Sequence, residues 1–148
     1  MAESNTSRWP AYARVPPFLP VPLRARADGW TAERQARFIG LLAETGSVAE
    51  AARRVGMSRE SAHRLRRHPR AGSFAHAWDA VVALRSGGRL QHRKITVEEL
   101  PDLAFEGPFH VLIRRQRFVR ACRKPSNSAL LRQVRRLDAL AARQGWEW

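Results

Sequence analysis

The chain has 148 residues, and its 27 lysines and arginines against 13 acidic residues give a formal net charge of +14 and a sequence pI near 11.8. Such a charge indicates a polyanionic partner, which means DNA, RNA or an anionic membrane surface. The sequence has no apolar run near the roughly 20 residues of a membrane span and no signal-peptide pattern. We therefore expect a cytoplasmic protein without a membrane partner.

Residues 1–28 are expected to form a flexible tail rich in proline. The prolines rule out a helix, so polyproline-like or disordered backbone is favoured, although Phe18 is apolar enough to dock on the rest of the protein. Arg24 and Arg26 lie just before the first predicted helix. They belong either to a solvated linker, which is the favoured interpretation, or to an arm that enters the minor groove of DNA.

Residues 29–86 have the pattern of a helical domain. Thr31 can cap a helix over 32–44, whose apolar residues recur at helical spacing. A later helix is predicted from its cap at Ser73 to about Arg85. The helix over 32–44 is needed as a support because the pair of short helices that follows it would bury too little apolar surface alone.

That pair lies in the run from Gly46 to Arg67, GSVAEAARRVGMSRESAHRLRR. Ser47 and Glu50 have the spacing of a capping box at the start of the first helix. Gly56 falls where this helix must stop, at a position that requires positive φ. Ser58 can cap the second helix. The spacing predicts two short helices joined by a tight turn.

The second short helix has a face rich in hydrogen-bond donors. Ala62 and Leu65 occupy its inner side, so the charged residues point outward. A helix of this kind fits the major groove, where arginine can bind guanine through two hydrogen bonds, while capped helix starts can offer backbone N–H groups to phosphates. The expected DNA-contacting residues are Ser47, Ser58, Arg59, Glu60, His63, Arg64 and Arg67.

The run from Gly46 to Arg67 resembles the homeodomain-like helix-turn-helix of bacterial transcriptional regulators, transposase-type DNA binders and phage terminase small subunits. The wider run from Trp30 to Leu84 is similar to bacterial helix-turn-helix proteins that have not been characterised. This resemblance implies binding of double-stranded DNA. The alternative is a helical pair that never touches DNA, with a merely solvated arginine face. The high positive charge of the whole chain favours the first interpretation.

Residues 87–148 form an arginine-rich C-terminal segment. Thr96 and Glu99 have capping-box spacing, but Pro101 is expected to limit that helix to about one turn. Apolar and polar residues alternate over 109–122, which favours a β-hairpin, with a helix as the alternative.

The last predicted helix starts at Ser126 and runs from Asn127 to about Gln144. Its apolar stripe either packs on the chain's own hairpin or joins a second copy in a homo-oligomer. The whole chain is therefore predicted to be mainly α, with a homeodomain-like bundle between a tail and a segment of hairpin plus helix. The stripe comprises Leu130, Leu131, Val134, Leu137, Leu140 and Ala141.

No enzymatic activity, cofactor or metal is expected. A phosphate-binding G-x-x-x-x-G-K-[ST] loop is absent, the carboxylates have no recurring spacing, and the histidines match no ligand pattern. The single cysteine, Cys122, excludes an internal disulfide. The expected function is sequence-specific binding of double-stranded DNA by a bacterial transcriptional regulator. The alternatives are a terminase small subunit, which would bind a large terminase subunit, and a basic structural RNA-binding protein.

Overall fold

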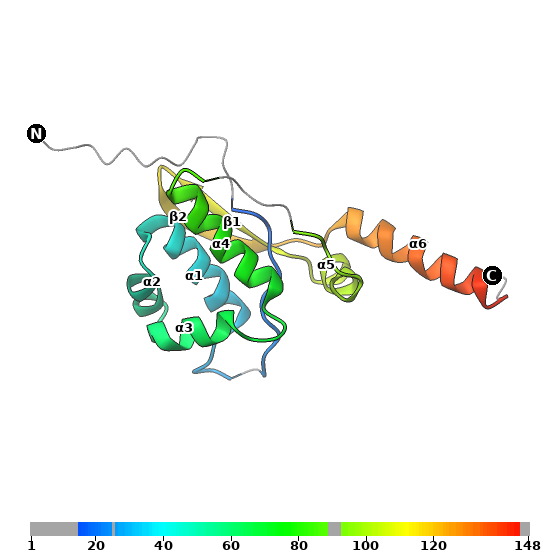
Figure 1. Cartoon of the computed structure of the whole chain (residues 1–148), viewed down its shortest axis with the longest axis horizontal. Coiled ribbons are helices and arrows are strands. Elements are labelled where there is room, and N and C mark those ends of the chain that lie inside the picture. Colours follow the sequence, from blue (N-terminus) through cyan, green and yellow to red (C-terminus); the bar gives the residue numbers. More distant parts are fainter. Residues whose placement is uncertain (1–14, 25, 89–92, 146–148) are drawn as a thin grey trace, which may run out of the picture.

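The computed structural model describes residues 15–24, 26–88 and 93–145. These residues form a mainly helical fold with one two-stranded antiparallel sheet, as the sequence predicts at this level (Figure 1). None of the described helices is both long enough and apolar enough to cross a membrane. The elements in chain order are α1 (Ala32–Thr45), α2 (Val48–Arg54), α3 (Arg59–Arg66), α4 (Gly72–Arg85), the 3-10 helix η1 (Val97–Glu99), α5 (Leu100–Phe105), β1 (Phe109–Arg114), β2 (Arg117–Arg123) and α6 (Asn127–Arg143).

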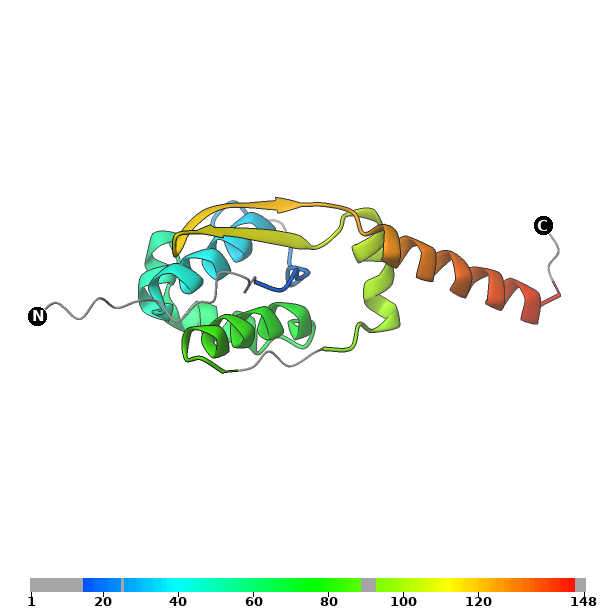
Figure 2. The ribbon, with the colours of Figure 1, turned by 90° about the horizontal axis from the view of Figure 1, so that it is seen from above.

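Helix α1 lies at the centre of the fold, between the hairpin of β1 and β2 and helix α4 (Figure 2). It begins at the predicted cap, where the Thr31 hydroxyl accepts the N–H of Arg34 at 3.2 Å. It ends at Gly46, whose φ of 70° is left-handed. The aromatic ring of Phe38 on this helix packs against Trp30 and Trp78, with ring centroids 5.4 Å and 5.0 Å away. This aromatic cluster fixes α1 against α4 and the segment before α1.

The proline-rich segment is part of this core over residues 15–21. Val15, Phe18 and Val21 are buried, and the backbone of Phe18 exchanges two hydrogen bonds with Phe109, of 3.2 Å and 2.8 Å. The expectation of a flexible tail is therefore wrong for this stretch. Proline forbids a helix there, but extended backbone can still dock its apolar side chains and pair with a strand. Residues 1–14 lie outside the described part of the chain.

Residues 109–123 form the predicted β-hairpin rather than the alternative helix, with Phe109 opposite Arg123. The inward side chains Val111, Ile113 and Phe118 pack on the core that α1 builds. The core consequently continues past residue 86, where the predicted helical domain was expected to end. A domain boundary after α4 would separate β1 and β2 from α1, the helix on which they pack.

The predicted cap of α4 and the predicted effect of Pro101 both differ from the structure. Ser73 does not cap α4; its hydroxyl accepts the N–H of Leu19 at 2.8 Å, so a contact distant in sequence replaces the local one. The helix that Thr96 caps, η1, is about one turn long as predicted, but Pro101 does not stop the helical structure there, because it lies in the first turn of α5, where no intrahelical partner needs its missing N–H. The predicted capping interaction before it is present, since the Glu99 carboxylate accepts the N–H of Thr96 at 3.1 Å.

Helix α6 projects away from the rest of the protein (Figures 1 and 2). Its first turn packs on α5, where Ala129 joins Leu100 and Ala104 in a small buried cluster. Most of its apolar stripe is exposed: Leu130 keeps 39% of its surface accessible and Leu137 keeps 49%. The interpretation that the stripe packs on the hairpin is therefore wrong. Of the stripe, only Ala141 is buried.

Candidate nucleic-acid interface

Helices α2 and α3 meet at a sharp turn built by the predicted residues. The hydroxyl of Ser47 accepts the N–H of Glu50 at 3.2 Å, and the hydroxyl of Ser58 accepts the N–H of Ser61 at 3.1 Å. Gly56 adopts a φ of 78°, which glycine does at least cost. Both serine hydroxyls thus act as acceptors in helix capping. Each keeps its own O–H, which is the donor that a phosphate contact at these two positions would use.

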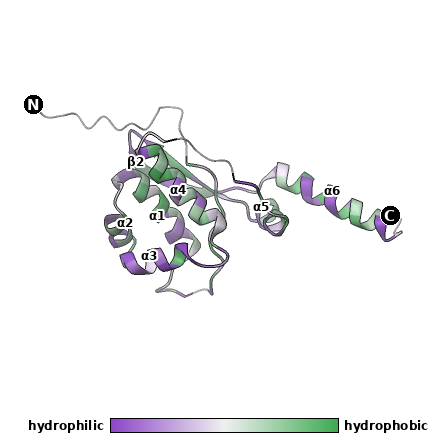
Figure 3. Ribbon diagram, in the orientation of Figure 1, coloured by the Kyte–Doolittle hydropathy of each residue, from purple (hydrophilic) through white to green (hydrophobic). Residues whose placement is uncertain are grey.

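The outward face of α3 carries the residues that the sequence singled out. Ala62 and Leu65 are buried beneath it, and Figure 3 shows the helix as largely hydrophilic. Arg59, Arg64 and Arg67 are exposed, and none of these three pairs with an acidic residue in the described ranges. Glu60 is exposed on the same face. The outward face of α3, defined as residues 59, 60, 63, 64 and 67, therefore combines free guanidinium groups with one carboxylate.

His63 lies at the edge of this face rather than at its centre. It is half-buried, and its ring centroid lies 5.3 Å from that of Trp78 on α4. Arg66 also stacks over Trp78, at 5.5 Å, and forms an ion pair with Asp79. The sequence analysis did not identify this role for Arg66. Arg66 lies three residues after His63, and residues at this spacing lie on the same side of a helix, which is the signal that both contact one neighbour. The two side chains orient α3 on α4.

The arginines of α2 differ from those of α3 because their charge is neutralised within the protein. The Arg53 guanidinium lies 2.6 Å from a Glu50 carboxylate oxygen, and Arg54 lies 3.1 Å from the same oxygen. These hydrogen bonds, that of Arg53 above all, hold the pKa of Glu50 below its ordinary value. Since this carboxylate is occupied, Glu50 does not reach back to complete a capping box; the Ser47 N–H donates to Thr45 Oγ1 at 3.2 Å.

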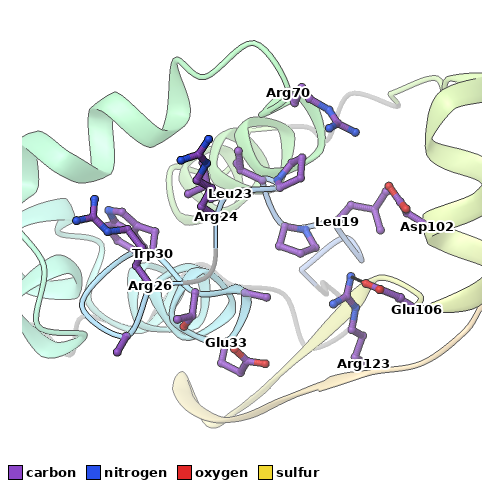
Figure 4. A pocket seen from close by; sticks show the side chains of 16 residues that line it. Leu19, Leu23, Arg24, Arg26, Trp30, Glu33, Arg70, Asp102, Glu106 and Arg123 are labelled. Carbon is purple, nitrogen blue, oxygen red and sulfur yellow. Dashed lines mark ion pairs between the residues drawn. The ribbon is translucent and has the colours of Figure 1, made fainter.

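The loop before α1 lies beside α3. The indole N–H of Trp30 donates to the hydroxyl of Ser61 on α3 at 3.2 Å, which ties the end of the loop to that helix. Arg24 and Arg26 are exposed on the loop, as a solvated linker would have them. They line a groove of about 790 Å³ together with Arg70, which follows α3 (Figure 4).

This groove has mixed charge. Glu33, Asp102 and Glu106 line it as well as the arginines, and Glu106 pairs with Arg123 at 3.1 Å (Figure 4). A polyanion would meet three carboxylates in it, so its interior is a poor site for nucleic acid. The exposed face of α3 is the better candidate.

Among residues 15–24, 26–88 and 93–145, no three side chains of His, Cys, Asp or Glu gather as metal ligands would. No protein-family model matches the chain, and neither a curated protein nor a solved structure resembles it significantly.

Proposed function

We propose that α1, α2 and α3 form a homeodomain-like helix-turn-helix that binds double-stranded DNA, and that the protein is a bacterial transcriptional regulator. The main support is that the arginines on the outward face of α3 are unpaired in the described residues, whereas Arg53 on α2 pairs with Glu50 and Arg54 pairs with both Glu50 and Glu44. A helix with its side chains is about 10–12 Å across, which matches the roughly 12 Å width of the major groove. Such a protein acts in the cytoplasm, where bacterial DNA lies.

Duplex DNA is a better partner for this face than duplex RNA. The major groove of A-form RNA is deep and narrow, so a helix cannot read it. Arg59 and Arg67 are exposed, half-buried His63 lies midway between them, and the spacing of four residues places all three along one side of α3. The helical presentation of the arginines therefore supports DNA over a structural RNA-binding role.

A terminase small subunit would use the same DNA-binding unit, and the α3 face alone does not separate it from a regulator. The two proposals differ in their protein partner. A packaging protein would bind a large terminase subunit, and a regulator would protect a discrete site near a promoter. Co-purification with that large subunit, compared with footprinting on genomic DNA, separates them.

We further propose that two copies associate through α6, because one recognition helix reads too few base pairs to select a site in a genome. Apolar residues follow one seam of the helix at alternating spacings of three and four residues, which is typical of coiled coils. No arginine lies on the seam or beside it. The seam comprises Leu130, Val134, Leu137 and Ala141. The flanking positions are Leu131, Gln133, Asp138 and Leu140, and the arginines of the helix are Arg132, Arg135, Arg136 and Arg143.

This charge arrangement favours a second copy over other apolar partners. A helix that lies on an anionic membrane would place its arginines beside the apolar face, near the headgroups. In α6 they lie on the far side, where two paired helices would keep them in water and apart from one another. Val134 at one core position and Leu137 at the next also suit a two-stranded pairing.

A salt titration tests the proposed function. The dissociation constant for a fluorescent duplex is measured by anisotropy between about 50 and 200 mM salt, where each phosphate contact contributes a slope near −0.9 on logarithmic axes. We expect steep weakening with salt and tighter binding of duplex DNA than of duplex RNA. Binding that does not depend on salt, or that favours RNA, would contradict the proposal.

A further inference from the structure

The tip of the β-hairpin has a turn that its sequence does not favour. Arg115 and Gln116 both adopt left-handed backbone, with φ of 48° and 66°. Two-residue turns of this kind favour Asn-Gly or Asp-Gly, because positive φ crowds the Cβ of other residues. Rules of local preference are broken most often at functional sites. The presence of Arg115 at such a position therefore indicates that its charge has a function.

Like charges also face each other across the hairpin. Arg114 on β1 lies directly opposite Arg117 on β2 in the strand register, an arrangement that destabilises a sheet. Arg120 adds a further exposed charge on β2. No acidic residue occurs anywhere between Phe109 and Lys124 to offset them.

These charges are exposed and available. We define the arginine tip as Arg114, Arg115, Arg117 and Arg120. All of them are exposed, and within the described ranges none forms an ion pair. Among the described residues, no carboxylate neutralises these repelling guanidinium groups, so they are available to an external anion.

The opposite face of the hairpin holds the tip in a fixed position. Phe118, which follows Arg117, packs on α1 so closely that a Cβ at Gly40 would overlap its ring. Val111 and Ile113 pack on the same core. The cluster thus stands on a packed strand pair, so little backbone entropy is lost when it binds.

We propose that the arginine tip is a second contact to the phosphate backbone of duplex DNA, outside the base pairs that α3 reads; this rests on the proposed function. A single small anion cannot neutralise several guanidinium groups, whereas duplex DNA carries one charge per roughly 1.7 Å of its axis. Arginine binds phosphate oxygens in a bidentate manner. Such contacts add affinity that is independent of sequence.

The test compares two double variants of equal charge change. Arg115→Gln with Arg117→Gln alters the tip, and Arg135→Gln with Arg136→Gln removes two exposed arginines from α6 as a matched control. Both are titrated with salt on a duplex of about 30 base pairs, once with a sequence selected by the wild-type protein and once with a scrambled sequence. Circular dichroism confirms that each variant is folded. If the tip variant does not fold, Arg120→Gln, outside the strained turn, is compared with Arg136→Gln alone, and its expected slope reduction is about 1.

The proposal expects the tip variant to bind both duplexes at least about tenfold more weakly, with the logarithmic salt slope reduced by about 2. Its preference for the selected sequence should be unchanged, and the control should lose less than about threefold. Equal effects of the two double variants, or none at the tip, would overturn the tip proposal while the proposed function stands. Failure of the wild-type protein to bind either duplex would overturn both.

Discussion

The side chain of Gln35 on α1 closes the loop that begins at Val21. Its Oε1 accepts the N–H of Val21 at 2.6 Å, and its Nε2 donates to the carbonyl of Val21 at 3.1 Å. The same Nε2 donates to the carbonyl of Trp30 at 3.2 Å. With only 1% of its surface exposed, Gln35 joins both ends of the loop that carries Arg24 and Arg26.

Replacing Gln35 by leucine should therefore destabilise the protein by about 1–3 kcal/mol, because buried backbone groups lose their partners while the volume is nearly kept. Urea unfolding followed by circular dichroism measures the change. Arg37→Leu on the exposed side of the same helix is the matched control, expected to stay within about 0.5 kcal/mol. Equal stability of the Gln35 variant and the wild-type protein would mean that the loop is not held in this way.

Gly40→Ala tests the packing of the hairpin on α1. In the interior of a helix this change normally stabilises by about 0.5–1 kcal/mol. Here the new Cβ would overlap the Phe118 ring, so we expect a loss of about 1–3 kcal/mol from overpacking. In a Phe118→Leu background the loss should shrink, which a double-mutant cycle of unfolding free energies measures. A stabilising effect in the wild-type background would mean that the hairpin does not cover this face.

Leu137→Glu tests association through α6. Leu137 lies on the seam with 49% of its surface exposed, so a charge there should disrupt pairing but not the fold of the protomer. Light scattering should show wild-type dimers at micromolar concentration and a monomeric variant with unchanged helical circular dichroism. Ala139→Glu, on the opposite side of the helix, is the control and should remain dimeric. Wild-type protein that is monomeric with and without DNA would contradict the assembly proposal.

The parts of the fold that depend on neighbours in sequence were predictable. The caps at Thr31, Ser47, Ser58 and Ser126 each accept an N–H three residues ahead, so the chemistry is contained in a short stretch. The hairpin was also predictable from the alternation of apolar and polar residues, although its turn lacks the usual Asn-Gly pair.

The rest could not be predicted because it depends on contacts between distant residues. From the sequence alone, Ser73 is as good a candidate for a helix cap as Ser58. In the structure its hydroxyl instead accepts the N–H of Leu19, which lies 54 positions earlier in the chain. Within the candidate site, Arg66 has the same chemistry as Arg64. Its ion pair with Asp79, which sets it apart, exists only once α3 and α4 are packed together.

The proposal that α3 reads DNA sequence can be tested at Arg64, because this side chain is exposed and unpaired among the described residues. A preferred duplex is first selected from a random pool with the wild-type protein. The dissociation constants of wild type, Arg64→Ala and the control Arg53→Ala are then measured by anisotropy on this duplex and on a scrambled one. We expect Arg64→Ala to cost about 1–3 kcal/mol on the selected duplex, a loss of about 5- to 150-fold, with little change on the scrambled one. The control should bind both nearly as the wild-type protein does, because Glu50 already neutralises Arg53. Unchanged binding of Arg64→Ala to both duplexes would contradict the claim, because α3 would then not face the DNA.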